Sequence, residues 1–285
     1  DLFSGKLRRN FQIQFGNAGR GLVFPYRLAR TNEPNSYKSE SNVKWEARRN
    51  VMPSETIPTG ICGITIKTND TLATLSLTLQ PQNNLNYDFN KLTIIHEKGP
   101  EIFDYYIKDE KGTFFSIVPE ATDNSKFTSV FSSDTLVHKF SISFATKDSL
   151  LKRHFTLYGI VAENNNPGVL YHMIGVNGAE YRHYNSSEYF LEQLSVLKPD
   201  LLLISLGTND AYPLSFQVEN FKRQVDTLLT SIRKLHPNAC VILTGPGDSY
   251  RKRKYKNKNM LIAGDMLKQY ALENYIAYWD WYNIM

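Results

Sequence analysis

A polar turn that begins with glycine follows a short apolar run in the last third of the sequence. Residues 201–206 are nearly all apolar, and Gly207, Thr208, Asn209 and Asp210 come directly after them. The side-chain amide of an asparagine at such a place can donate a hydrogen bond to the oxyanion that develops during acyl transfer. Gly, Asn and Asp also dominate ordinary turns. The stretch alone therefore leaves two interpretations open, an oxyanion-stabilising turn and a simple polar turn.

The apolar run that precedes this turn predicts a β-strand. It is short, and turn-forming residues lie on both sides of it. A continuous run of this kind is typical of a parallel strand that is buried on both faces, because helices cover both sides of such sheets. Ligand sites of open α/β sheets lie beyond the carboxyl ends of the strands. Asn209 is expected at that edge.

A second apolar run closes in a glycine turn about thirty residues earlier in the chain. The run and its turn occupy residues 168–179, and the turn contains Gly178. Residues 186–188 offer helix-capping side chains, and apolar residues then recur at helical spacing over 190–197. The order strand, glycine turn, helix, strand and polar turn predicts a βαβ unit with both turns at one edge of the sheet. We therefore expect Gly178 to lie close to Asn209.

The pair of turns resembles the SGNH (GDSL-like) hydrolases. The resemblance implies that the Gly178 backbone N–H and the Asn209 amide complete an oxyanion hole. Gly207 would permit the tight turn and Asp210 would fix it. Within the superfamily, the motif IGVNGA at residues 174–179 and the flanking architecture look most like the peptidoglycan O-acetylesterase branch. This chemistry requires neither a cofactor nor a metal.

The middle of the chain has a different character. Short alternating runs are separated by turn signals, which favours an antiparallel β-sandwich or jelly roll. The runs lie at residues 60–67, 73–79, 91–96, 102–108, 113–118, 136–145 and 154–162. The O-acetylesterase branch is similar in having a carbohydrate-module-like sandwich inserted after its first helix.

The fold predicted for the whole chain is α/β. A flavodoxin-like, three-layer SGNH hydrolase domain would be interrupted by the inserted all-β jelly-roll or sandwich domain. The start of the hydrolase domain would be residues 1–33, the insert 34–166, and the remainder of the hydrolase domain 167–285. Within this frame, residues 1–15 predict an amphipathic helix. Helices at 221–235 and 258–274 and strands at 239–244 and 275–281 are expected near the end of the chain.

Charge and cysteine content exclude few classes of protein. The net charge is +5 and the pI near 9.0, partly because of the basic residues at 251–258. That cluster suits either a solvated loop or attraction to an anionic polymer such as cell-wall glycan. No nucleic-acid-binding motif accompanies it, so no nucleic-acid partner is expected.

No apolar run approaches the roughly 18 residues that span a bilayer. Cys62 and Cys240 are expected to be free, buried thiols.

A serine nucleophile and a histidine base are not evident among these residues. Ser249 belongs to a Gly-Asp-Ser, but it follows both turns, whereas the serine of SGNH enzymes precedes them. Glu180 and His183 imitate the family's Asp-x-x-His at the wrong place in the chain. The six histidines show no zinc-like spacing, so no metal site is expected. By the resemblance, the nucleophile lies upstream of residue 1 and the His–Asp pair downstream of residue 285. The chain alone would then be incomplete and inactive.

The predicted function is that of a serine ester hydrolase, a carboxylic ester hydrolase of the acetylesterase type. Its substrate would be O-acetylated cell-wall peptidoglycan or another polysaccharide, which it would deacetylate through an acyl-enzyme. The resemblance implies a periplasmic or extracellular place at the cell envelope. Two alternatives remain: an SGNH lipase or thioesterase, and a non-catalytic glycan-binding protein. The sequence leaves the oligomeric state open.

Overall fold

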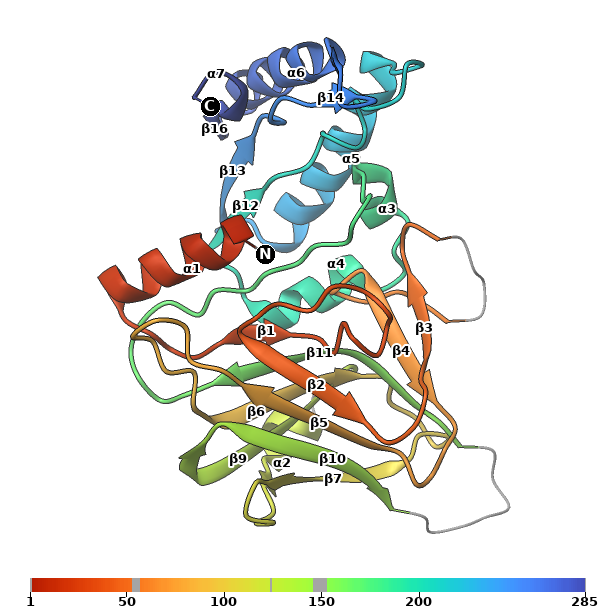
Figure 1. Cartoon of the computed structure of the whole chain (residues 1–285), viewed down its shortest axis with the longest axis vertical. Coiled ribbons are helices and arrows are strands. Elements are labelled where there is room, and N and C mark those ends of the chain that lie inside the picture. Colours follow the sequence, from red (N-terminus) through yellow and green to blue (C-terminus); the bar gives the residue numbers. More distant parts are fainter. Residues whose placement is uncertain (1, 53–56, 124, 146–152, 285) are drawn as a thin grey trace. The chain divides into compact units, whose positions relative to one another are not determined.

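The computed structural model of the chain describes residues 2–52, 57–123, 125–145 and 153–284 (Figure 1). Two compact units make up the chain. The first contains Asp1–Arg49 and Ser54–Ile174, and the second contains Asn50–Pro53 and Gly175–Met285. The architecture is mixed: the first unit is built mainly from antiparallel strands, and the second combines helices with a parallel sheet.

Two antiparallel sheets form the first unit. One has the strand order β3-β4-β11-β6-β9-β8, with β1 also paired to β11, and the other has the order β2-β5-β10-β7. The first sheet contains β1 (Gly21–Val23), β3 (Glu46–Arg49), β4 (Ile64–Thr68), β6 (Phe89–His96), β8 (Ser116–Ile117), β9 (Thr128–Val137) and β11 (Phe155–Glu163). The second contains β2 (Tyr37–Ser41), β5 (Thr74–Leu79), β7 (Asp104–Asp109) and β10 (Lys139–Ala145). A short helix, α2 (Pro119–Asp123), lies between β8 and β9.

Aromatic side chains join the two sheets. Phe89 of β6 meets Phe140 of β10 with ring centroids 5.6 Å apart, and Phe144 of β10 meets Phe155 of β11 at 5.0 Å. All four rings are at most 7% exposed. Each buries a large apolar surface, so this layer between the sheets is the core of the unit. The single run expected at residues 136–145 is in fact the end of β9 and all of β10, which belong to different sheets.

The helix predicted at the start of the chain is present as α1 (Leu2–Phe15). It leads into a glycine-rich segment that runs alongside residues 167–172. Gln12 donates its side-chain amide to Gly19 O at 2.8 Å and to Val169 O at 3.1 Å, and Val169 N–H donates to Gly16 O at 2.9 Å. Side-chain and isolated backbone hydrogen bonds therefore hold residues 16–22 against residues 167–172, and this contact is the glycine seam.

The strand expected within residues 168–179 is not formed. Val169 makes one isolated parallel bridge to Asn17, and the residues after it are irregular. Further along, the ring Nδ1 of His172 accepts the Leu22 N–H at 3.1 Å. The prediction was wrong because the segment has no ladder partner within the described residues. Its polar contacts are instead isolated bonds to residues 12–22.

The second unit contains a three-stranded parallel sheet in the order β12-β13-β16. Its strands are β12 (Leu201–Ile204), β13 (Cys240–Thr244) and β16 (Ala277–Trp279). The helices are α3 (Tyr181–Asn185), α4 (Phe190–Leu194), the 3-10 turn η1 (Ser195–Leu197), α5 (Val218–Leu235), α6 (Asn259–Glu273) and α7 (Trp281–Ile284). A small hairpin pairs β14 (Tyr250–Arg251) with β15 (Tyr255–Lys256). The predicted helices and strands after residue 210 are thus confirmed, with shorter bounds for the last strand.

One face of the parallel sheet is more exposed than its sequence predicts. Leu201 is 49% exposed, Leu203 39% and Trp279 46%. Pairing register and strand alternation place these three side chains on the same face. Cys240 shares that face and is exposed, whereas Cys62 is buried, and both thiols are free. Burial of β12 on both faces and burial of Cys240 were therefore wrong predictions, because these side chains are exposed in the described structure.

Candidate active site

The two turns singled out in the sequence meet at the carboxyl end of β12. The Asn209 side-chain amide donates to Ala179 O at 2.9 Å, and Asp210 Oδ1 accepts the Tyr181 N–H at 3.1 Å. These two bonds join the segment around Gly178 to the turn that follows the strand. The proximity of Gly178 and Asn209 that their spacing predicts is confirmed, although the run before Gly178 is not a strand.

Donors at this junction remain available for a ligand. Gly178 is exposed, with a φ of 84°, and its N–H donates no hydrogen bond within the part of the chain that the structure describes. Asn209 is also exposed, and its amide uses one bond, to Ala179. The second amide hydrogen is free to donate elsewhere. The geometry therefore offers two neutral donors beside one another, held in place by the bond to Ala179 O.

Gly207 occupies a backbone position that other residues rarely adopt. Its φ is 111°, and a Cβ there would lie 3.3 Å from the ring of Phe221. Its carbonyl accepts the Ala211 N–H at 2.9 Å, which closes the turn around Asn209. Glycine is the residue that reaches such a conformation without strain. The expected permissive role of Gly207 agrees with this geometry.

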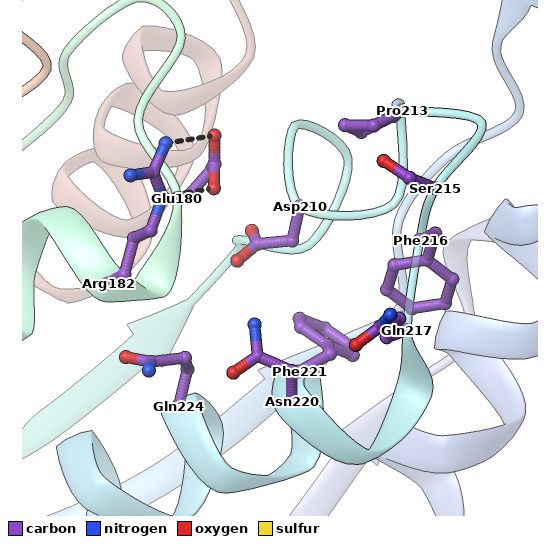
Figure 2. A pocket seen from close by; sticks show the side chains of 10 residues that line it. All are labelled: Glu180, Arg182, Asp210, Pro213, Ser215, Phe216, Gln217, Asn220, Phe221 and Gln224. Atoms are coloured by element: carbon purple, nitrogen blue, oxygen red, sulfur yellow. Dashed lines mark hydrogen bonds and ion pairs between the residues drawn. The ribbon is translucent and has the colours of Figure 1, made fainter.

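A pocket opens beside Asp210 (Figure 2). Its volume is about 180 Å³, and seven of its ten lining residues are polar or charged, which makes it unlike a slot for a hydrocarbon chain. The loop after β12 and the first turns of α5 supply Ser215, Gln217 and Asn220. Figure 2 shows the Asp210 carboxylate turned away from Ser215 and Gln217, toward the side of the pocket that Glu180 and Arg182 line. Sequence reasoning did not find this pocket, because it forms only when α5 packs next to the turn.

Comparison with known proteins gives this arrangement a family. Residues 146–285 match the GDSL-like Lipase/Acylhydrolase family. The chain carries a GDSL-like hydrolase domain. No curated protein sequence matches it. The match to this acylhydrolase family supports an ester hydrolase.

Solved structures align with this chain to very different degrees. A peptidoglycan O-acetylesterase aligns with a TM-score of 0.77 and 18% identity, over 100% of this chain and 75% of its own. A family two carbohydrate esterase from Cellvibrio japonicus aligns with a TM-score of 0.28 and 12% identity, over 86% of this chain and 89% of its own. An active-site mutant of a family two carbohydrate esterase from Clostridium thermocellum gives 0.33 and 11%, over 76% and 84%. The first of these shows the fold of the chain.

The GDSL-like domain contains a carboxylate with an unusual environment. Burial raises the pKa of Asp210 to about 6, and the bond from Tyr181 N–H opposes the shift. Its Oδ1 accepts that bond, while Oδ2 is buried with no hydrogen-bond partner in the described structure. Nearby, Glu180 is engaged by Arg182, whose Nε lies 2.7 Å from its carboxylate. Asp210 therefore holds the junction through one oxygen and carries an unmet acceptor on the other.

Asp210 predicts a pH dependence of stability. Because its pKa is raised in the folded protein, its contribution to stability is fully present below about pH 4 and is lost as the pH rises through about 6. Asp210→Asn keeps an oxygen for Tyr181 N–H but cannot ionise. We expect the variant to exceed the wild type at pH 7.5 by on the order of 2–3 kcal/mol in unfolding free energy and to match it at about pH 3.5. Urea unfolding at both pH values checks this, and an equal difference at both would contradict it.

The serine and histidine candidates of the GDSL-like region serve other contacts. Ser249 Oγ is buried without a partner in the described structure, and the Ser249 carbonyl accepts the Asn257 N–H at 2.8 Å. His183 Nδ1 accepts the Glu180 N–H at 2.9 Å at the start of α3, and burial lowers its pKa. Ser249 thus lies in the segment just before β14, and His183 is a buried residue at the start of α3.

Two Ser–His contacts occur elsewhere in the described residues. His96 Nε2 lies 2.8 Å from Ser129 Oγ, but both residues are at most 5% exposed, and burial lowers the pKa of His96 to about 4. Its Nδ1 faces a backbone carbonyl, not an acid. Ser195 Oγ and His236 Nε2 are 3.4 Å apart on the surface. Neither pair has the nucleophile, base and acid order that acyl transfer needs.

Metal-ligating side chains do not gather in the described part of the chain. No group of three or more His, Cys, Asp or Glu residues there could hold a metal ion. Among the same residues, no helix is both long and apolar enough to cross a membrane. The candidate site of the GDSL-like domain thus consists of backbone and amide donors, the left-handed glycine Gly207 and the pocket next to Asp210.

Proposed function

We propose that this protein is a serine ester hydrolase that removes O-acetyl groups from cell-wall peptidoglycan or another polysaccharide. The observation that carries the proposal is the junction of the two turns, where the Gly178 N–H and the second Asn209 amide hydrogen are both uncommitted. Preorganised neutral donors of this kind stabilise the oxyanion of a tetrahedral intermediate. Gly207 and Asp210 support them by shaping and holding the turn.

In the proposed reaction an activated serine attacks the acetyl carbonyl. Its proton passes to a histidine held by an aspartate. When the bond between the acetyl carbon and the sugar oxygen breaks, the histidine gives that proton to the departing oxygen, which leaves as the sugar hydroxyl. The acetyl-enzyme is then hydrolysed by water. Gly178 and Asn209 bind the carbonyl oxygen in both tetrahedral states, when its negative charge is greatest. No residue described above is assigned as the serine or the histidine.

The pocket favours a sugar-borne ester over a lipid or thioester substrate. A long acyl chain needs an apolar channel, whereas Gln217, Asn220 and Asp210 present hydrogen-bonding groups to the space beside the turn. The Gln217 and Asn220 side-chain amides would donate to and accept from sugar hydroxyls. The peptidoglycan O-acetylesterase that shares the fold is consistent with this substrate class, and the proposed place of action is the cell envelope.

The two antiparallel sheets are proposed to form a carbohydrate-module-like β-sandwich inserted into the hydrolase domain. Residues 34–166 would be the insert, and residues 1–33 and 167–285 the interrupted domain. The aromatic layer between the sheets supports the sandwich, and the parallel sheet that begins at β12 supports the return to the hydrolase domain. A jelly-roll module of this kind offers a second surface for glycan.

Acetate release tests the proposed function. The full-length protein is incubated with O-acetylated peptidoglycan, with an acetylated neutral polysaccharide and with p-nitrophenyl esters of two and twelve carbons. We expect acetate from the polysaccharides and faster cleavage of the short ester than of the long one. Preference for the long ester with no acetate from glycan would favour a lipase. Binding of glycan without hydrolysis of any ester would favour a non-catalytic module.

A further inference from the structure

The net positive charge of the chain is concentrated in one short segment. Residues 248–258 hold six basic side chains and one acidic side chain, which leaves 27 basic and 27 acidic residues in the rest of the chain. The basic residues are Arg251, Lys252, Arg253, Lys254, Lys256 and Lys258. The net charge of this segment therefore equals the +5 of the whole chain. Such a local field attracts an oppositely charged partner.

The segment folds into the hairpin of β14 and β15, and its tip is strained. Lys254 N–H donates to Arg251 O at 3.1 Å, which closes a turn with Lys252 and Arg253 at its centre. Both central residues have left-handed backbones, with φ of 51° and 57°. Asn and Gly are the residues that favour such a turn, and longer side chains there are costly. Two cations thus occupy positions at which turn stability alone would select other residues.

A buried asparagine and a partly exposed arginine bind the hairpin to the loop that follows the candidate oxyanion hole. Asn257 is 1% exposed, and its side-chain amide donates to Ala211 O at 3.2 Å. Arg251 donates to Tyr212 O at 3.0 Å and to Pro213 O at 3.1 Å. Tyr212 is three residues after Asn209, so the two lie within about 11 Å of each other along the chain. The hairpin is therefore mounted next to the site.

The remaining cations and two tyrosines of the hairpin face solvent. Lys252, Arg253 and Lys254 are exposed, and none of them pairs with a carboxylate within the described chain. Tyr250 is 50% exposed and Tyr255 59%, and Lys254 Nζ lies 5.5 Å from the centre of the Tyr255 ring. An exposed aromatic ring next to free cations offers an apolar face and charge to the same partner.

We propose that the β14–β15 hairpin binds the carboxylates of an anionic polysaccharide that extends beyond the ester held at Gly178 and Asn209. Lys252, Arg253 and Lys254 would contact carboxylates, and the rings of Tyr250 and Tyr255 would contact sugar faces. The inference rests on the proposed function, since it assigns the polymer next to the reacting ester. It narrows the substrate class from polysaccharides in general to those that carry carboxylates, as peptidoglycan does on its peptides.

Features of the hairpin favour a glycan over a membrane or a nucleic acid. Insertion into a bilayer needs apolar side chains at the tip, whereas this tip is Lys252-Arg253-Lys254. A nucleic-acid surface would be expected to extend beyond one turn, yet the rest of the chain has no net charge. The mounting of the hairpin on residues 211–213 places its charges beside the site that would hold the ester.

Co-sedimentation with purified peptidoglycan sacculi tests the proposal. The full-length protein is mixed with native sacculi or with sacculi whose carboxylates have been converted to amides, at 50 mM and 500 mM NaCl. We expect amidation, or the higher salt, to weaken binding on the order of ten-fold, the scale on which electrostatic attraction acts. Equal binding to both preparations would overturn the proposal.

Matched variants test whether the charged side chains of the hairpin cause the binding to sacculi. Lys252→Gln/Lys254→Gln should weaken binding to native sacculi on the order of ten-fold. Lys234→Gln/Lys268→Gln, which removes two exposed lysines from α5 and α6, should leave binding unchanged. Lys252→Asn/Arg253→Gly supplies the preferred turn residues, so it should keep or raise the melting temperature while binding falls. This last variant separates loss of charge from loss of folding.

The outcomes distinguish this inference from the proposed function. Cleavage of p-nitrophenyl acetate should be the same in all the lysine variants and in wild type. Unchanged binding in the hairpin variants, or equal loss in the α5/α6 control, would overturn the hairpin proposal. So would tighter, hairpin-dependent binding to single-stranded DNA or to phosphatidylglycerol vesicles than to sacculi. Absence of ester cleavage by the wild type would refute the proposed function and leave the sedimentation result standing.

Discussion

Asn209→Ala should lower kcat for acetate release by about 10²–10³ while KM changes little. The second amide hydrogen of Asn209 is uncommitted and stands beside the free Gly178 N–H, so its removal takes one of the donors that hold the developing oxyanion. An interaction made mainly in the transition state affects kcat and kcat/KM alike. Asn209→Asp should be worse, because it brings negative charge to the place where negative charge develops.

The neighbouring residue supplies a control for this prediction. Thr208 is exposed on the same turn, and Thr208→Ala should leave kcat within about two-fold. Asn209→Ala also loses the bond to Ala179 O, which costs about 1 kcal/mol of stability. Circular dichroism and a thermal melt therefore accompany the rate measurement. A folded Asn209→Ala variant with an unchanged rate would rule out the oxyanion role.

The candidate site was predictable to the extent that it depends on short segments of the chain. A strand end followed by Gly-Thr-Asn-Asp, and a glycine turn thirty residues earlier, led us to expect that the two turns lie together, although the strand expected before Gly178 is not formed. The hydrogen bond from Asn209 to Ala179 O joins the two turns. The pocket was not predictable, because it needs the side chains of α5 to approach Asp210 through packing. The same is true of the buried, unpartnered oxygen of Asp210.

Failures of the fold prediction share a physical cause. Apolar runs were interpreted as strands buried on both faces, but a run becomes a strand only when another strand pairs with it. Residues 168–175 have one bridge and otherwise isolated bonds, so they remain irregular. Leu201 and Leu203 are in a true strand, yet one of its faces is exposed. Composition and spacing indicate which segments can form a strand. Whether the strand forms, and whether both of its faces are buried, depends on residues that are far away in the sequence.

Contacts at Gly168 explain why the seam between residues 16–22 and 167–172 is rich in glycine. A Cβ at Gly168 would lie 2.2 Å from Gly16 C and 2.5 Å from Asn17 N, and its φ is 148°. The obstructing atoms belong to backbone, so no side-chain rotation can relieve the contact. Val169 N–H and O both bond to this partner segment, which means that any displacement also breaks hydrogen bonds.

Gly168→Ala should therefore destabilise the first unit by about 3 kcal/mol or more, the cost of overpacking combined with a strained backbone. For a unit of this size, the melting temperature should fall by roughly 6–12 °C. Gly175→Ala is the control, because a Cβ there meets nothing within 4 Å and its φ is not in the left-handed region. Calorimetry compares the two variants with wild type. If Gly168→Ala melted together with Gly175→Ala, the seam would not be the close backbone contact described here, and the segments would have to pack at a greater distance.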